Sequence, residues 1–280
     1  MWVEAPDGIM ALQTAVPHTK DNAMLRVRPV HFTSRTGSWK QLLTALGMVQ
    51  TEDDGGWQVF DSASGRLALH GAEAGSAQDG RTVFGVEVGD VAEFARRTNL
   101  SALEEGSRED GARHEGAPAE GTQPAELVSA DHGEACRISA PDGFSFLADK
   151  ASHTAQCADA DPALAVVAVW YTPDPEGAVR TLLHVGARPR PVPDNDETAD
   201  FTAKNGGVLL VRPASGPSRS GLGFEYDGGL GPLQERLTAA GFPASVTEEA
   251  FGSTLHVANP DAGSPNAPAT VWISQRRPMG

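Results

Sequence analysis

Four side chains in this sequence have the chemistry to bind a small molecule, and they come in matched pairs. His31 and His70 lie in predicted strands, and Trp170 and Arg212 follow them at distances of 139 and 142 residues. An imidazole can bind a metal ion or transfer a proton near neutral pH. An indole stacks on aromatic or cationic ligands, and a guanidinium binds anions through a fork of N–H groups. We therefore expect these four residues to contact a ligand.

Each of these residues also has a plainer interpretation. A histidine in a strand is often only a hydrogen-bonded structural residue, a tryptophan often fills the interior, and an arginine is often an ordinary surface charge. Trp57 and Trp272 form a further pair for which both interpretations stay open, as ligand-binding cavity walls or as core. The elements that carry the six residues must decide between the two.

Those elements follow one repeated pattern. Residues 28–48 predict a strand, a turn and an amphipathic helix, with Ser38 as its N-cap and Gly47 as its end. Variants of this stretch recur at residues 83–99, 166–186 and 221–241, and short strands follow each of them. The sequence therefore predicts four β-α-β-β-β units, because a near-constant offset between matching patterns indicates an internal repeat.

The units group into two domains. We predict a disordered N-terminal extension over residues 1–24, a first domain over 25–149, a linker over 150–163 and a second domain over 164–276. The stretch from Asn99 to Pro124 is rich in Glu, Gly, Ala and Ser, and we predict a solvated loop there. Predicted strands follow at 125–129, 133–139 and 144–148.

Composition excludes several classes of protein. The formal net charge of −15 over 280 residues opposes binding to nucleic acid or to anionic membranes. No apolar run is long enough for a membrane-spanning helix. The two cysteines, Cys136 and Cys157, predict free thiols and a cytoplasmic location rather than a disulfide framework. The chain has no G-x-S-x-G elbow, phosphate loop or C-x-x-C pair.

The order of these patterns resembles the vicinal oxygen chelate superfamily, which includes glyoxalases, extradiol dioxygenases and bleomycin resistance proteins. The carrying motifs are SWKQLLTALGM at Ser38–Met48, FGVEVGDV at Phe84–Val91 and APDGF at Ala140–Phe144. The resemblance covers about residues 25–149 and 164–275. It implies an α+β fold, in which four β-α-β-β-β units pair into two glyoxalase-like domains. Curved mixed sheets would form cups, with the helices outside.

The resemblance also implies a metal site, and here the sequence departs from the family. Family metalloenzymes hold a divalent ion with His or Glu from the first and last strands of each unit. Counting along the motifs places apolar residues at all of these positions, namely Val27, Ala68, Val83 and Leu147 in the first half and Val166, Leu210, Gly221 and Trp272 or Ile273 in the second. We therefore expect no cofactor and no metal site in either half.

Within a strand, side chains alternate between the two faces, so His31 shares a face with Val27, and His70 with Ala68. If Val27 and Ala68 face the cup, both histidines do so too. The first cup would then carry a histidine pair and the second a Trp170 and Arg212 pair.

The sequence therefore favours a metal-independent protein that binds an apolar or aromatic small molecule, as a monomer or homodimer. The alternative is a metal-dependent lyase, isomerase or dioxygenase of the glyoxalase or dioxygenase type, with His31 and His70 in a relocated metal site. A third hypothesis is that one or both halves serve only to form dimers or to bind a protein.

Overall fold

The computed structural model describes residues 3–4, 10–11, 24–110, 123–155, 157–191, 198–249 and 252–276. The extension predicted over residues 1–24 falls mostly outside these ranges. Its described parts are β1 (Val3–Glu4) and β2 (Met10–Ala11), which pair antiparallel, and Met24, which is buried. Among the described residues, no helix is long and apolar enough to cross a membrane.

The remaining elements form four units, each with a first strand, a helix and three further strands. In the first and second units the first strand is divided into two short strands. The first unit contains β3 (Leu25–Val27), β4 (Val30–Thr33), α1 (Thr36–Ala45), β5 (Val49–Asp54), β6 (Trp57–Asp61) and β7 (Arg66–Gly71). The second contains β8 (Thr82–Val83), β9 (Gly85–Val88), α2 (Val91–Asp110), β10 (Ala125–Ala130), β11 (Gly133–Ser139) and β12 (Ser145–Lys150). The third contains β13 (Leu164–Thr172), α3 (Pro175–His184), β14 (Arg188–Arg190), β15 (Ala199–Thr202) and β16 (Val208–Pro213). The fourth contains β17 (Arg219–Tyr226), α4 (Leu230–Ala239), β18 (Ala244–Glu249), β19 (Gly252–Ala258) and β20 (Thr270–Gln275).

The strands of the two halves follow the same order. The second half forms one eight-stranded sheet, β14-β15-β16-β13-β17-β20-β19-β18. In the first half, β3 pairs with β9 and β4 pairs with β8 in one continuous antiparallel register, from Leu25 opposite Val88 to His31 opposite Thr82. The interruption at Pro29 divides this half into two five-stranded sheets, because proline has no N–H for the ladder. Both halves are thus centred on an antiparallel pair of first strands.

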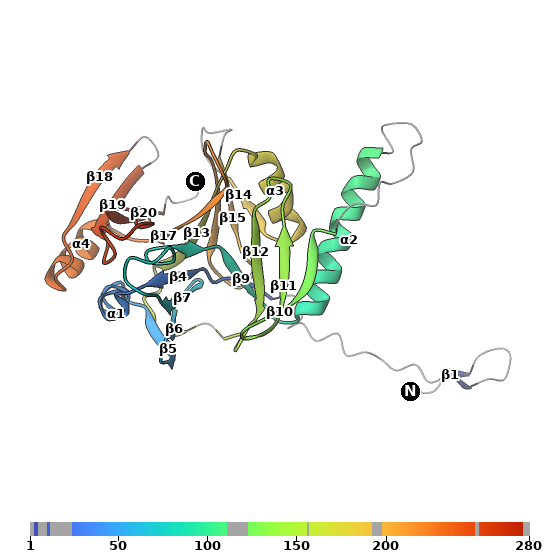
Figure 1. The fold of residues 1–280 in the computed structure, drawn as a ribbon, viewed down its shortest axis with the longest axis horizontal. Coiled ribbons are helices and arrows are strands. Elements are labelled where there is room, and N and C mark those ends of the chain that lie inside the picture. Colours follow the sequence, from blue (N-terminus) through green and yellow to red (C-terminus); the bar gives the residue numbers. More distant parts are fainter. Residues whose placement is uncertain are drawn as a thin grey trace.

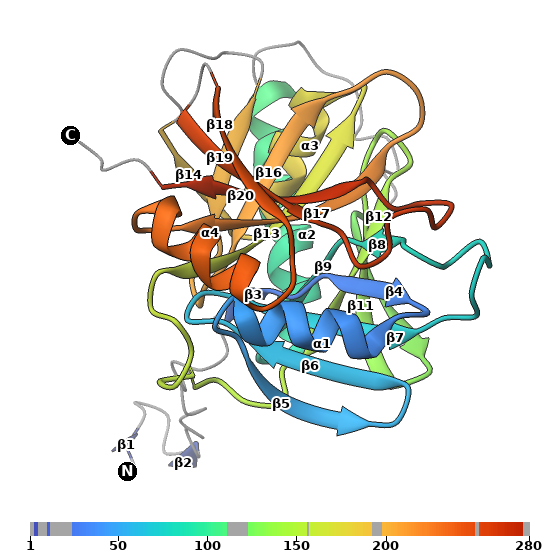
Figure 2. The ribbon, with the colours of Figure 1, turned by 90° about the vertical axis from the view of Figure 1, so that its left-hand side faces the viewer.

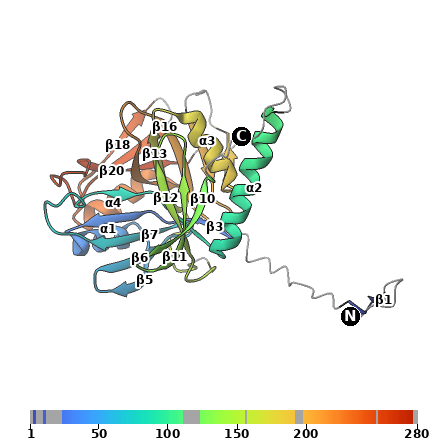
Figure 3. The same ribbon diagram turned by 45° about the vertical axis from the view of Figure 1, so that its right-hand side comes forward.

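The helix-covered faces of the two halves meet in one core. That core includes residues of all four helices and runs through both halves. In Figure 2, α1 lies beside α4, and in Figures 1 and 3, α2 lies beside α3. Burying this apolar surface, at roughly 25 cal/mol per Å², is the main force that holds the halves together. The opposite faces of the sheets carry no helix. We call them the first cup and the second cup.

Backbone contacts join the halves near their centre. The N–H of Val27 in β3 donates to Gly206 O at 3.0 Å, and the N–H of Val166 in β13 donates to Ser64 O at 2.8 Å. Gly207 lies in the left-handed region, and a side chain there would come within 2.3 Å of Val27 Cβ. Glycine at position 207 therefore permits the close approach of the two halves.

Three predicted boundaries are wrong. Helix α1 begins at Thr36, two residues before the predicted cap Ser38, whose position lies inside the helix. Helix α2 continues through Asp110, although residues from Asn99 onward were predicted as loop. Its Ala, Leu, Glu and Arg residues favour helix, and high polarity does not distinguish a solvated helix from a loop. The rest of that predicted loop, residues 111–122, lies outside the described residues. Strand β12 extends to Lys150 and so includes Asp149.

Candidate functional site

The register of β4 and β7 decides which predicted residues face the first cup. These strands are parallel, with His31 opposite Leu69 and Phe32 opposite His70. Neighbouring residues across a sheet share a face, so His70 and His31 lie on opposite faces. The even-numbered residues of β3 and β4 face the cup, whereas Val27 and His31 face the helices. The expectation that both histidines share the cup is therefore wrong.

His31 is a buried partner of a carboxylate from the other half. Its Nε2 lies 2.8 Å from Asp261 Oδ2, its Nδ1 lies 2.9 Å from Thr82 Oγ1, and its ring centre lies 4.3 Å from that of Trp39 in α1. Thr33 and Trp39 also donate to Asp261, at 2.7 Å each. Burial alone would raise the pKa of Asp261, but the hydrogen bonds from His31, Thr33 and Trp39 outweigh it and hold the pKa below its usual value.

Trp170 occupies the equivalent position in the second half and is also turned away from the cup. It is fully buried and stacks on Phe144 with ring centres 4.5 Å apart. Two residues further along β13, Thr172 donates at 2.6 Å to Asp142 of the first half, which also accepts from Ser218. Asp142 and Asp261 thus make equivalent contacts, each from one half to the other. The prediction that Trp170 lies in the second cup is wrong.

A third carboxylate joins the halves at the start of α1. Asp79 accepts backbone hydrogen bonds from Gly75 at 3.0 Å and Ser34 at 2.9 Å, and the hydroxyl of Ser264 donates to it at 3.0 Å. The hydrogen bond from Gly75 is the largest influence on its pKa, and together these bonds lower the pKa to about 2 against the opposing effect of burial.

The other four predicted residues do lie on cup faces. In the first cup, Trp57 lies opposite His70, with ring centres 6.1 Å apart. In the second cup, Arg212 donates to Asp200 at 2.8 Å. Trp272 lies flat against Gly223, where an added Cβ would come within 2.2 Å of the indole. The structure thus separates the six residues into two pairs on the cups and two buried residues between the halves.

A buried network of charges fills the first cup, and the sequence interpretation missed it. Glu87 accepts from Arg26 at 2.7 Å and from Arg66 at 2.9 Å, and Arg28 Nε lies 2.9 Å from it. Arg28 also pairs with Asp149 of β12. The side chains of the three arginines are at most 5% exposed. Such charges are tolerated in the interior only when they are paired, so the network acts as a unit.

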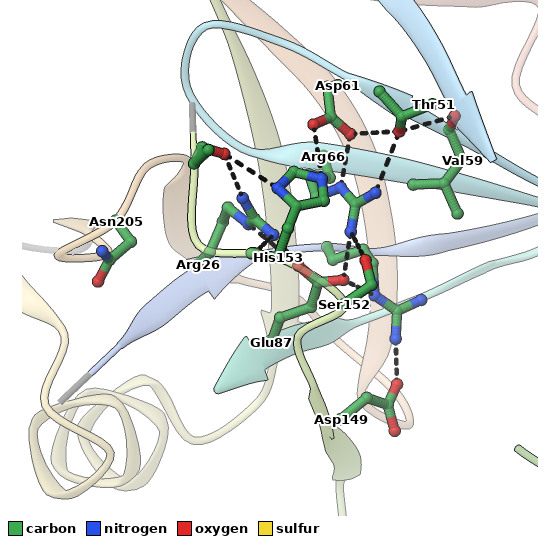
Figure 4. A network of polar contacts seen from close by, with 12 residues as sticks. Arg26, Thr51, Val59, Asp61, Arg66, Glu87, Asp149, Ser152, His153 and Asn205 are labelled. Atoms are coloured by element: carbon green, nitrogen blue, oxygen red, sulfur yellow. Dashed lines mark hydrogen bonds and ion pairs between the residues drawn. The ribbon is translucent and has the colours of Figure 1, made fainter. Parts of the chain in front are cut away.

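The segment that follows β12 covers this network (Figure 4). The carbonyl oxygen of His153 accepts from Arg26 at 2.8 Å, and the hydroxyl of Ser152 accepts from Arg66 at 3.1 Å. His153 Nε2 also lies 3.2 Å from Asp61, which pairs with Arg66 at 2.6 Å. Residues 152 and 153 therefore seal the arginines from solvent, and the first cup has little room for a ligand at this end.

The second cup keeps the glutamate but replaces the arginines with apolar residues. In the strand registers, Glu225 stands where Glu87 does, opposite Ala165 instead of Arg26. Val167 and Val208 correspond to Arg28 and Arg66. A separate small apolar cluster results, formed by Ala165, Val167, Val169, Val208 and Leu210, with Tyr171 and Trp272 packed against it. No helix contributes to this cluster. The second cup therefore presents an apolar floor edged by two aromatic rings.

Comparison with known proteins gives the fold a name. No protein-family model matches the sequence, and no curated protein matches it closely enough to indicate a relationship. Solved structures do match. The Mn(II)-bound glyoxalase of Novosphingobium aromaticivorans has a TM-score of 0.54 and 12% identity, over 91% of this chain and 82% of that chain. The chain has the vicinal oxygen chelate fold.

Two dioxygenases share this vicinal oxygen chelate fold with the chain. The 2,3-dioxygenase LapB of Pseudomonas sp. KL28 has a TM-score of 0.52 and 12% identity, over 89% of this chain and 90% of that chain. Homoprotocatechuate 2,3-dioxygenase of Arthrobacter globiformis has a TM-score of 0.50 and 17% identity, over 93% and 82%. At these identities the likeness establishes the fold, and function must be argued from the cups.

The cup residues do not fit the metal ion that this fold holds in its metalloenzymes. Within the described ranges, no three His, Cys, Asp or Glu side chains gather so as to hold a metal ion. Glu87 and Asp149 are carboxylates on the face of the first cup, next to the predicted apolar positions. Both are already paired with Arg28, and a divalent cation would be repelled by that guanidinium and its neighbours. The floor of the second cup offers apolar side chains.

Proposed function

We propose that the protein binds an apolar or aromatic small molecule in the second cup, without a metal ion. The apolar floor carries this proposal. Val167 and Val169 belong to a cluster to which no helix contributes; each is only 1% exposed, and Tyr171 and Trp272 pack against the cluster. Apolar and aromatic side chains with a few polar groups at their edge are the usual lining of a small-molecule site.

The charged side chains of the second cup are better suited to orienting a ligand than to catalysing a reaction. Arg212 is paired with Asp200, and Arg190 is paired with Glu225 at 2.9 Å, so the polar groups at the edge can orient a ligand. A relocated metal site in the first half, the alternative from the sequence, would need His31 and His70 together. They lie on opposite faces of the sheet, which disfavours that alternative.

The test is a direct binding measurement with a matched pair of variants. Tryptophan fluorescence and calorimetry would follow titration of a panel of aromatic compounds into the wild-type protein and into the Trp272→Ala and Trp57→Ala variants. We expect Trp272→Ala to weaken binding at least tenfold and Trp57→Ala, in the first cup, to change it less than twofold. Equal loss in both variants, or loss in Trp57→Ala alone, would refute the assignment to the second cup.

A second arm tests independence from metal. Affinity measured after treatment with a chelator, and again with added Mn²⁺ or Zn²⁺, should be the same. A dependence of affinity on the added ion would contradict the proposal.

A further inference from the structure

The guanidinium of Arg190 reaches across the second cup. Arg190 lies in β14, and the sheet order β14-β15-β16-β13-β17 places it four strands away from Glu225. In a flat sheet, four strand spacings would separate them by about 19 Å. The Nη2 atom of Arg190 nevertheless donates to Glu225 Oε2 at 2.9 Å. The sheet therefore curves so strongly that this ion pair spans the apolar floor.

Arg190 has a further donor with no partner. Its Nη1 atom is buried and makes no hydrogen bond within the described residues, although the side chain is only 20% exposed. A buried N–H group without an acceptor is unfavourable and rare in native proteins. The other groups at this edge are engaged, since Arg212 donates to Asp200 and Arg219 lies over the Tyr171 ring at 4.6 Å. An acceptor atom on a ligand beside Nη1 would satisfy this donor.

The carboxylate beside Arg190 does not block such an acceptor. Glu225 accepts from Nη2 of Arg190 at 2.9 Å and also lies 3.8 Å from Arg276. Arg276 pairs in addition with Asp227 at 3.3 Å, so two carboxylates balance the two guanidinium groups. An anionic oxygen on a ligand would accept from the free Nη1 in a charge-assisted hydrogen bond, which a cationic ligand lacks.

From this geometry, and resting on the proposed function, we infer that the second cup binds an aromatic monoanion. The aromatic ring lies against the half-buried rings of Tyr171 and Trp272 at the edge of the apolar floor, and an anionic oxygen, such as that of a carboxylate, accepts from Arg190 Nη1. Arg190 is thus the residue that sets the charge of the ligand, while the floor sets its apolar character.

Three isosteric probes of different charge test the inference: 2-naphthoate, 2-naphthamide and 2-naphthamidinium. Calorimetry with the wild-type protein should show 2-naphthoate binding at least tenfold more tightly than 2-naphthamide, with 2-naphthamidinium weakest. In Arg190→Gln the preference for the anion should fall below threefold, while the affinity for 2-naphthamide stays within twofold of wild type. Arg137→Gln, which removes an exposed arginine of the first half, should keep the full preference. Circular dichroism would show that each variant is folded.

The possible failures are distinguishable. If the amide and the anion bind equally well to the wild type, or if Arg190→Gln retains the preference, the inference about charge is refuted and the proposed binding function stands. Tightest binding of the amidinium would also overturn it and would identify Glu225 as the selecting group. If none of the three probes binds, both the inference and the proposed function fail.

Discussion

Loss of Glu87 should destabilise the protein far more than loss of its counterpart in the second cup. The carboxylate of Glu87 is 4% exposed and balances Arg26, Arg28 and Arg66. Its replacement by glutamine removes the carboxylate paired with buried Arg26, while Arg28 keeps Asp149 and Arg66 keeps Asp61 and Glu52. Removing one partner of a buried ion pair typically costs about 3–5 kcal/mol of unfolding free energy, and we expect Glu87→Gln to fall in that range.

Glu225→Gln is the matched control, because Glu225 holds the same register position in the second half. Its side chain is 14% exposed, and its partner Arg276 is 46% exposed, so solvent compensates much of the lost pairing. We expect a loss of about 1 kcal/mol. Urea unfolding followed by both tryptophan fluorescence and circular dichroism would give the two free energies. A difference of less than 1 kcal/mol between the variants would show that the first-cup network is not a coupled buried unit, and would refute the reasoning.

Three further predictions follow from individual contacts. Because the pKa of Asp79 is lowered to about 2, its contribution to stability is complete above about pH 4 and is lost as pH falls toward 2. Asp79→Asn should therefore reduce the dependence of the unfolding free energy on pH between about 4 and 2. An unchanged slope would contradict this. Gly223→Ala should displace the indole of Trp272, lower stability by about 1–3 kcal/mol and shift the tryptophan emission; an unperturbed spectrum would show that the ring does not lie on that backbone. Burial raises the pKa of Cys136 to about 11, so at pH 8 a thiol reagent should modify Cys157 first and Cys136 only on unfolding, and equal rates would count against its burial.

The repeat was readable from the sequence because each unit carries a helix with a clear apolar stripe and a glycine at its end. The cup residues Ala68, Leu210 and Leu147 also follow from counting along the motifs, since the strands that carry them are regular. Counting failed in the first strands of the odd units, where Val27 and Val166 were taken one residue away from the true cup positions. A slip of one residue exchanges the two faces of a strand. It placed His31 in the cup and left Arg26 and Arg28 unnoticed.

The sequence by itself determined the four units, their order and the positions of most strands, because these depend on local periodicity and on turn residues. Only the tertiary structure decided which face each side chain occupies and which charges meet. Arg66 and Glu87 are 21 residues apart and Asp149 is far beyond both, yet curvature brings them into one network. Likewise, Arg190 and Glu225 meet across four strands. Such pairings depend on sheet curvature and register, which arise from long-range packing that no local pattern of residues records.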